Sequence, residues 1–374
     1  MEFIIKKKNI IDALFKVQGI TGRSTNLAIT SDILINIFSS KISITANNLE
    51  TVFFGEYEAD IQSEGVITIN SNKFFEIIKE YPFEEILIKE VKNRWIEIGE
   101  GDTQYNIVAS NYENFPQTPI IDDVDFIEVD CFNIKRMVEI TSGINYSSDE
   151  KRIYMLGVLL EKINKDEKKL RIVSTDSKRL HCYEFDYEGE IQLPEENILI
   201  PKKAFSEIGK FVINKEGKVK LGIKDNHIIV SKDNEIIMIK LFNGEYPNYH
   251  RLLDTENMTS INIEKNMLYT MLKRVSILIS ENYKSILIKL KNNELITTIE
   301  NPEIGDFKDK LKIDYSGEEI QSAFNPRYFL EAVKIINEDN LILYIKDEEN
   351  PFLLKGLGDD KLTCIIMAMK IYGN

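Results

Sequence analysis

The stretch FNPRYFLEAVKII, residues 324–336, has two counterparts in the same chain, INSNKFFEIIKEY at 69–81 and IPKKAFSEIGKFV at 200–212. Each stretch follows a run of residues typical of a strand, and its apolar residues then recur with the spacing of one helix face. Asn325 suits the residue that caps a helix, and Pro326 suits the first helical turn, which does not use its N–H. The three stretches therefore predict three equivalent helices.

Three further sets of segments recur in the same order along the chain. They are a helix at the start of each third, a polar turn between strands, and an aromatic–proline pair. The segments are KKNIIDALFKV (7–17), NIKRMVEITSGI (133–144) and NMLYTMLKRVSIL (266–278) for the helix; ITANNLE (44–50), VSTDSKR (173–179) and, more loosely, TTIENPE (297–303) for the turn; and NYENFP (111–116) with FNGEYP (242–247) for the pair. Chance could give one such repeat, but four in the same order indicate a domain duplicated threefold.

Between the predicted helices the chain is typical of strands, because apolar residues alternate or form short runs rich in Ile and Val. Short polar turns at 224–226 and 291–293 separate them. A parallel sheet would need a helix between most strands, and such helices are missing. The sequence predicts an α+β fold in which each domain packs two helices on antiparallel sheets. We place domain 1 at 1–121, domain 2 at 122–254 and domain 3 at 255–374.

The composition excludes several classes of protein. A formal net charge of −14 argues against a uniformly basic surface that grips nucleic acid, and 43% hydrophobic residues are ordinary for a folded chain. Cys131, Cys182 and Cys364 lack metal-ligand spacing, and the last two lie in apolar runs, which predicts buried, reduced thiols. No segment has the pattern of a membrane span or a signal sequence, so we expect a cytoplasmic protein.

A catalytic or metal site is not expected, and no cofactor is predicted. The three histidines, His181, His227 and His250, have no metal-ligand spacing, and neither a nucleophile elbow nor a phosphate loop is present. His181 and Cys182 are neighbours on a predicted strand, where alternation sends one side chain inward and the other outward. The Gly-Leu-Gly at 356–358 is more typical of a turn than of a phosphate site.

Cationic residues concentrate on the predicted helices, on the face opposite the apolar stripe, whereas acidic residues crowd the loops and strands. The cations are Lys7, Lys8, Lys16, Lys73, Lys79, Lys135, Arg136, Lys202, Lys203, Lys210, Lys273, Arg274, Arg327 and Lys334. Lysines that merely solvate each helix would explain one such face. The same bias on six predicted helices of an acidic chain favours one shared surface that faces a polyanion.

Five segments give the chain a resemblance to the bacterial DNA polymerase III beta subunit, the sliding clamp family, over essentially its whole length. They are YSGEEIQSAFNPRYFLEAV (315–333), STDSKRL (174–180), FNGEYPNYHRLL (242–253), NKFFEI (72–77) and MAMKI (367–371). The resemblance implies the DNA clamp fold: three domains of like topology per chain, and two chains that close head to tail into a ring. Helices would line the hole and sheets would form the outside. The family has no catalytic chemistry.

By this resemblance, the turn at 174–180 is the rim of a pocket for short peptides. The pocket residues implied are Met155, Thr175, Ser177, Lys178, Arg179, Leu180, Pro247, Leu252, Asn325, Tyr328, Pro351, Met367, Met369 and Lys370. The implied partners are the polymerase alpha subunit, the clamp loader and repair proteins, which would insert a motif of apolar residues and Gln. Met, Leu and Pro form an adaptable apolar floor, and polar groups on the rim orient a peptide.

The resemblance also implies sequence-independent contact with double-stranded DNA, and a homodimer. Arg23 and Arg152 match DNA-contacting loops of the family, and Tyr105 and Ile107 would meet Ile277 and Leu278 of the partner. The charge pattern adds further candidates for the surface that faces DNA: Lys73, Lys135, Arg136, Lys203, Lys210, Lys273 and Arg274.

The chain departs from the family pattern where Ser177-Lys178 replaces the common Gly followed by an aromatic residue or His. Met367-Ala368-Met369-Lys370 replaces the usual Met-Pro-Met-Arg. These differences leave a second hypothesis open, a diverged clamp-like interaction scaffold without a replicative role on DNA.

Overall fold

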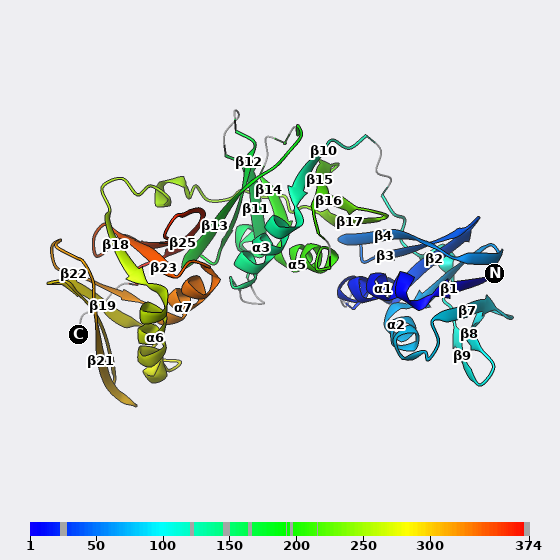
Figure 1. Ribbon diagram of the computed structural model, residues 1–374, viewed down its shortest axis with the longest axis horizontal. Coiled ribbons are helices and arrows are strands. Elements are labelled where there is room, and N and C mark those ends of the chain that lie inside the picture. The colour runs from blue at the N-terminus through cyan, green and yellow to red at the C-terminus, as the bar shows by residue number, and fades with distance from the viewer. Residues whose placement is uncertain are drawn as a thin grey trace. The chain divides into compact units, whose positions relative to one another are not determined.

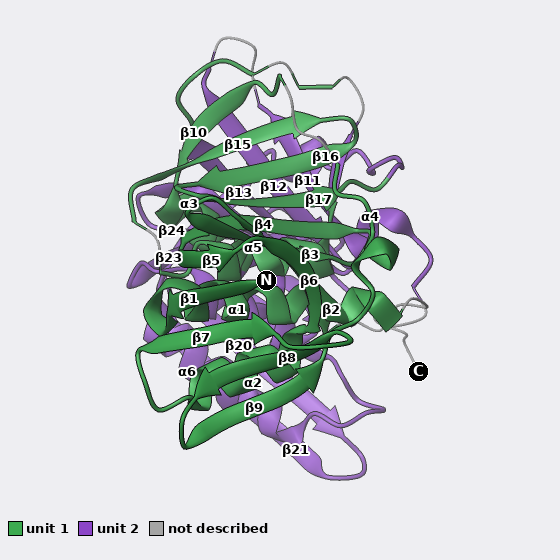
Figure 2. Ribbon diagram, turned by 90° about the vertical axis from the view of Figure 1, so that its right-hand side faces the viewer, with its two compact units in different colours: residues 1–138, 187–195, 200–242 green, residues 139–186, 196–199, 243–374 purple. Residues whose placement is uncertain are grey.

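The computed structural model describes residues 1–22, 28–119, 123–144, 150–163, 167–191, 193–194, 197–214 and 216–369 (Figure 1). The chain forms two compact units (Figure 2). Unit 1 comprises 1–138, 187–195 and 200–242, and unit 2 comprises 139–186, 196–199 and 243–374. The predicted boundaries at 121–122 and 254–255 stay a prediction.

The predicted helices are all present in the described parts of the chain. They are α1 (Lys7–Thr21), α2 (Ser71–Glu80), α3 (Cys131–Ser142), α5 (Lys202–Phe211), α6 (Lys265–Val275) and α7 (Pro326–Ile335). A further single turn, α4 (Ile153–Leu156), was not predicted. Pro326 begins α7 and the Asn325 side chain accepts from the N–H of Arg327 at 3.0 Å, which confirms the predicted cap. None of the described helices combines the length and the apolar composition needed to cross a membrane.

Unit 1 contains two antiparallel sheets. Its strands are β1 (Glu2–Lys6), β2 (Asp32–Phe38), β3 (Lys41–Asn47), β4 (Thr51–Glu58), β5 (Asp60–Ser63), β6 (Gly65–Asn70), β7 (Glu85–Glu90), β8 (Trp95–Glu100), β9 (Thr103–Val108), β10 (Phe126–Asp130), β15 (Lys218–Lys224), β16 (His227–Lys232) and β17 (Glu235–Lys240). The five-stranded sheet has the order β5-β1-β7-β8-β9, and the eight-stranded sheet has the order β10-β15-β16-β17-β4-β3-β2-β6. The second sheet is continuous because β17 pairs with β4.

Unit 2 also contains two sheets. Its strands are β11 (Gly157–Lys162), β12 (Lys169–Thr175), β13 (Arg179–Asp186), β14 (Ile198–Pro201, of which Ile198 and Leu199 belong to this unit), β18 (Thr259–Glu264), β19 (Ile286–Lys291), β20 (Glu294–Asn301), β21 (Gly305–Lys312), β22 (Ile320–Phe324), β23 (Asn340–Ile345), β24 (Phe352–Gly356) and β25 (Asp359–Ile366). The eight-stranded sheet has the order β14-β11-β12-β13-β25-β24-β23-β18, and the four-stranded sheet has the order β21-β20-β19-β22. Here β13 pairs with β25.

The short polar turns form tight hairpins. Asp225 and Asn226 join β15 to β16 with φ of 46° and 63°, and Asn292 and Asn293 join β19 to β20 with φ of 50° and 60°. Asp and Asn tolerate this left-handed backbone better than most residues, and it matches the twist of paired strands. Both turns lie where the sequence predicted them.

The helices bury their apolar stripes against the sheets. In unit 1, α1 lies beside α2 and packs on β3 and β4 (Figure 1). Ile10 and Leu14 of α1 and Phe74 of α2 are fully buried there, each contributing about 1.5–3 kcal/mol of burial free energy. In unit 2, α6 packs on α7 and on β18, β20 and β21.

Lys16 contradicts the predicted cationic face of α1, because its side chain is only 4% exposed. Its Nζ lies 2.7 Å from Asp12 Oδ2 and 2.8 Å from Glu235 Oε2. The Tyr57 hydroxyl donates to Glu235 Oε1 at 2.8 Å, and burial together with that carboxylate raises the pKa of Tyr57. A buried ammonium needs such a carboxylate partner. Lys16 therefore belongs to the core and cannot face a polyanion.

The expectation that one of His181 and Cys182 points outward is also wrong, because both side chains are buried, at 1% and 2% exposure. Strand β13 lies inside the eight-stranded sheet and both of its faces are covered, so neither neighbour points to solvent. The three cysteines are buried and none forms a disulfide, as predicted. Burial raises the pKa of the Cys182 thiol to about 12, which makes it unreactive at neutral pH.

Candidate functional site

The turn between β12 and β13 is held by its own side chains. Asp176 Oδ1 accepts from the N–H groups of Lys178 and Arg179 at 2.9 and 3.0 Å. Thr175 Oγ1 donates to the Arg179 carbonyl at 2.7 Å and accepts from the Ser177 N–H at 3.1 Å. These bonds fix Ser177 at φ 66°, a left-handed backbone that costs a serine about 1 kcal/mol. The turn is therefore a rigid rim, which we call the rim turn (Asp176–Arg179).

A cavity of about 220 Å³ opens beside the rim turn, within unit 2. The predicted pocket residues that line it are Thr175, Ser177, Arg179, Leu180, Pro247, Leu252 and Met367. The sequence did not single out four further lining residues: Tyr154, Tyr246, Asn248 and Tyr249. An apolar and aromatic lining with a few polar groups at the edge suits a peptide with apolar side chains.

The tyrosines form one wall of this cavity. The Tyr246 ring meets Tyr154 and Tyr249 edge to face, with ring centroids 6.1 Å apart in both pairs. The Tyr154 hydroxyl lies 3.2 Å from Ser177 Oγ, so the wall reaches the rim turn. Burial raises the pKa of Tyr246 and Tyr249, and both hydroxyls stay protonated at neutral pH. The three-residue spacing of Tyr246 and Tyr249, in a segment that contains Pro247, is the sequence signal from which this wall could have been predicted.

Several other predicted pocket residues lie near this cavity without lining it. Met155 Sδ is 3.5 Å from Ser177 Oγ, and the Lys178 carbonyl accepts from the Met367 N–H at 2.9 Å. The Tyr328 ring stacks under the Arg179 guanidinium at 4.5 Å. The remaining predicted residues are placed as follows: Asn325 caps α7, Pro351 is buried before β24, Met369 bridges to Ala323 of β22, and Lys370 lies outside the described residues.

Most predicted DNA-contacting cations are exposed, but several carry a carboxylate partner. Lys73 Nζ lies 3.0 Å from Glu76, and Lys210 Nζ lies 3.0 Å from Glu207. In a third pair, Arg274 Nε donates to Asp309 Oδ2 at 2.8 Å. These pairs offset part of the positive charge that the sequence predicted for the helices.

The other cations differ in exposure. Arg136 is only 6% exposed, so its guanidinium does not face solvent, which argues against the predicted contact with DNA. Lys203 and Lys273 are exposed and Lys135 is half-buried. Arg152 donates to Glu150 at 2.8 Å and its hydrogen bonds lower the pKa of that carboxyl to about 2. Arg23 lies outside the described residues.

The predicted dimer residues lie at the edges of two sheets. Strand β9 is an edge of the five-stranded sheet and carries Tyr105, 37% exposed, and Ile107. Ile277, 76% exposed, and Leu278 lie in the short helix η4 (Ser276–Leu278), which packs on the edge strand β21. Open sheet edges with exposed apolar side chains are a template for pairing with another chain.

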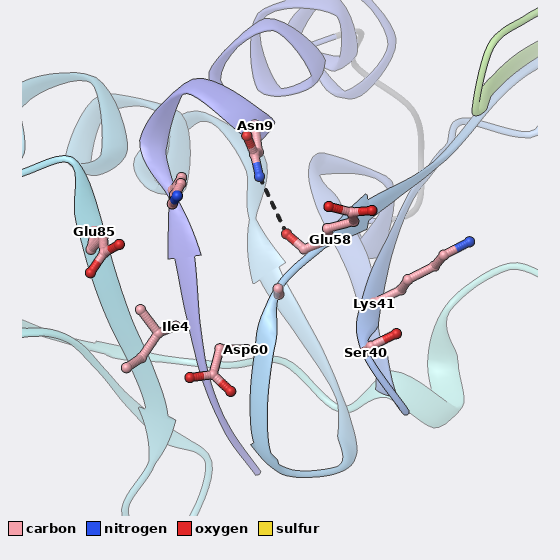
Figure 3. A pocket seen from close by; sticks show the side chains of 9 residues that line it. Ile4, Asn9, Ser40, Lys41, Glu58, Asp60 and Glu85 are labelled. Carbon is pink, nitrogen blue, oxygen red and sulfur yellow. Dashed lines mark hydrogen bonds between the residues drawn. The ribbon is translucent and has the colours of Figure 1, made fainter.

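A second cleft, of about 490 Å³, lies in unit 1 (Figure 3). Its lining mixes the acids Glu58, Asp60 and Glu85 with lysines, and Asn9 donates to the Glu58 carbonyl at 3.4 Å. None of the predicted site residues lines it.

Comparison with protein families decides the assignment. Three models match consecutive parts of the chain: the N-terminal domain of the DNA polymerase III beta subunit at 1–119, its central domain at 128–248, and its C-terminal domain at 250–370. The chain belongs to the DNA polymerase III beta subunit family. This confirms the resemblance found in the sequence.

Relatives of this DNA polymerase III beta subunit family agree along the full length. The chain is 27% identical to a beta sliding clamp of Chlamydia pneumoniae, covering 100% of both chains. It is 26% identical to a beta sliding clamp of Haemophilus influenzae, covering 99% of this chain and 100% of the relative.

Solved structures of the family share the fold. The chain superposes on the DNA polymerase III subunit beta of Pseudomonas aeruginosa with a TM-score of 0.90 at 23% identity, covering 99% of this chain and 100% of that one. The sliding clamp of Bacillus subtilis gives a TM-score of 0.90 at 22% identity, covering 100% of both chains. The three-domain clamp fold that the sequence predicted is therefore confirmed.

Proposed function

We propose that the chain is a DNA sliding clamp, a non-catalytic processivity factor of DNA polymerase III that works in the cytoplasm. Two copies would close head to tail around duplex DNA, and the cavity beside the rim turn would tether the polymerase and other clamp-binding proteins. The ordered match of all three domains of one family along residues 1–370 is the observation that supports this most strongly.

The edge strands support a ring of two chains. Strand β21 presents Lys308 and Lys312 to solvent, together with one acid, Asp306. Glu100, at the end of β8, and Asp102, in the turn to β9, are also exposed. Opposite charges on two different edges favour a head-to-tail interface, which closes after two copies if the rotation is suitable. Tyr105 and Ile107 would then pack against Ile277 and Leu278 of the partner.

The cations support loose, sequence-independent contact with DNA. Exposed lysines attract phosphate at long range, but the ion pairs of Lys73 and Lys210 reduce the number of charges available for tight contact. Retention on DNA would then depend on encirclement more than on affinity.

The test combines solution mass with retention on DNA. We expect a mass of twice the 43.3 kDa chain in light scattering. After loading with a bacterial clamp loader, the protein should stay on nicked circular DNA and be lost when the circle is cut. Ile277→Asp should give monomers and abolish retention on circles, whereas Leu357→Asp, at another exposed apolar residue between β24 and β25, is the matched control. A wild-type monomer, or equal loss from circular and linear DNA, would contradict the proposal.

A clamp-like scaffold without a role on DNA is the second candidate, favoured by the buried Arg136 and the ion-paired helix cations. Replacing Lys73, Lys203 and Lys273 together by Glu separates the two. A clamp should load onto circular DNA less efficiently, whereas a scaffold should be unaffected. Peptide binding at the cavity should persist in both cases, since none of these lysines lines it.

A further inference from the structure

The Arg179 side chain is 4% exposed, and each of its three guanidinium nitrogens donates a hydrogen bond within the protein. Its Nε donates to Asp176 Oδ2 at 3.0 Å, and Nη2 donates to the carbonyl of Gly143, just after α3, at 2.8 Å. Its Nη1 donates to Glu331 on α7. Bonds between an arginine and carboxylates are among the strongest and most directional hydrogen bonds in proteins.

Helix α7 holds this guanidinium from two positions. Glu331 is one, and Tyr328, one turn earlier on the same helix, places its ring 4.5 Å from the guanidinium carbon. Such stacking stabilises an arginine most when it is shielded from water, as here. Neither Glu331 nor Tyr328 lines the cavity, and both contact the Arg179 side chain of the rim turn.

The rim turn in turn depends on Arg179. Asp176 receives the Arg179 side chain on one carboxylate oxygen and the N–H groups of Lys178 and Arg179 on the other. The Lys178 carbonyl then accepts from Met367, which lines the cavity. The chain of contacts therefore runs from α7 through Arg179 and Asp176 to the edge of the cavity.

We infer that Arg179 is a positioning residue, which fixes the rim turn to α7 and so sets the shape of the cavity for its ligand. Three of its five N–H groups are bonded within the protein and the side chain is 4% exposed, so a bound peptide meets mainly its aliphatic stem. The exposed ammonium of Lys178 is the cation that the rim offers to a ligand. The effect on ligand affinity rests on the proposed peptide-binding function, whereas the effect on the rim turn does not.

Glu331→Gln tests this inference without altering the cavity lining. It keeps the size of the side chain but removes the charge that holds Arg179. Hydrogen exchange by mass spectrometry should show amides 176–179 opening at least ~10-fold faster, because local opening sets their protection. Lys334→Gln, an exposed change on the same helix, is the matched control and should leave these amides at the wild-type rate.

Ligand affinity is the second readout. The probe is a fluorescein-labelled six-residue peptide of Gln, Leu and Phe, and its affinity is measured by fluorescence anisotropy. It should bind Glu331→Gln about 5–10-fold more weakly than wild type, because one lost charged hydrogen bond disturbs the geometry of the site. Arg179→Lys keeps the positive charge but loses the planar guanidinium. It should therefore also speed exchange in the rim turn and weaken the binding of the peptide.

The two readouts separate the inference from the proposed function. A wild-type protein that ignores the peptide would refute the peptide-binding function, and exchange at 176–179 would still decide the role of Arg179. Unchanged exchange in both Glu331→Gln and Arg179→Lys would overturn the inference. Thermal unfolding within a few degrees of wild type confirms that Glu331→Gln is folded, and if it is not, Tyr328→Leu removes the other α7 contact.

Discussion

Two buried cations, Lys16 in unit 1 and Arg179 in unit 2, lie near strand pairings that join the parts of the chain matched by different domain models. Lys16 lies near the pairing of β17 with β4, and Arg179 begins β13, which pairs with β25. Both cations are 4% exposed. Their carboxylate partners differ, since Glu235 is 6% exposed and Glu331 is 44% exposed. The Lys16–Glu235 pair is buried in the core, although Lys16 also pairs with Asp12, which is 42% exposed. The Arg179–Glu331 pair touches solvent beside a cavity.

The difference shows that a buried cation paired with carboxylates can have two roles in this protein. A pair with both members buried stabilises the structure, because removing one member leaves the other charge buried and unpaired. A pair in which one member is exposed to solvent beside a cavity can be strengthened or weakened by a ligand that enters that cavity. The predictions below test this contrast.

The largest expected effect is that of Lys16→Met. It leaves Glu235 buried without its cation and should lower the free energy of unfolding of unit 1 by about 3–5 kcal/mol. Urea unfolding can be followed by the fluorescence of Trp95 on β8, the one tryptophan of the sequence. Lys8→Met, an exposed change on α1, is the control and should have little effect.

A double variant sharpens this result. Glu235→Gln added to Lys16→Met removes the stranded charge and keeps an acceptor for the Tyr57 hydroxyl, so most of the lost stability should return. A loss below about 1 kcal/mol in Lys16→Met alone would show that the pair is not sealed from water.

Arg179→Met should cost less, about 1–3 kcal/mol. The Glu331 carboxylate that it leaves behind is already half in water, and the Asp176 carboxylate, which is 10% exposed, keeps its bonds from the N–H groups of Lys178 and residue 179. Urea unfolding followed by circular dichroism measures the loss, with the exposed Arg327→Met on α7 as the control. A loss as large as that of Lys16→Met would remove the contrast between the two cations.

Alkaline pH should lower the stability of unit 1 through Tyr57, which lies in the buried cluster with Lys16 and Glu235. Burial and the Glu235 carboxylate raise the pKa of Tyr57 above its ordinary 10.0, so the neutral phenol is favoured in the folded state. The stabilisation is complete below pH 10 and falls as pH rises above it, because the unfolded chain ionises first. Stability should decline by about 1.4 kcal/mol per pH unit from this residue. Tyr57→Phe should make the free energy of unfolding, measured with urea, decline less steeply between pH 10 and 11. The same slope as in wild type would contradict a raised pKa of Tyr57.

Salt should produce the smallest effect. Molar salt screens charges that reach solvent but hardly affects buried ones. Exchange at amides 176–179 should rise about twofold as the Arg179–Glu331 pair weakens, whereas amides around Lys16 should keep their rate. Equal acceleration at both places would mean that the cluster of Lys16 is open to ions.

The repeated helices were predictable because their signals are local. Caps such as Asn325 and apolar stripes are properties of neighbouring residues, so the sequence alone located α7 and its counterparts. The burial of Lys16 had a local hint, since it lies between Ala13 and Ile20 at helical spacing. Its partner Glu235 lies 219 positions away and comes close only when β17 pairs with β4.

The candidate site was predictable in part for the same reason. Thr175 to Leu180 form one short segment, and the resemblance identified it. The tyrosine wall combines Tyr154, on the unpredicted turn α4, with Tyr246 and Tyr249, and no local pattern joins these segments. The burial of both His181 and Cys182 likewise depends on β25, which covers one edge of β13 from far along the chain.

The burial of the cysteines has a practical consequence. Reagents such as maleimides attack the thiolate, and the Cys182 thiol, with its pKa near 12, is almost entirely protonated at neutral pH. Cys131 and Cys364 are buried as well. A single cysteine engineered on the surface would therefore take up a fluorophore selectively, and the native thiols need not be removed first.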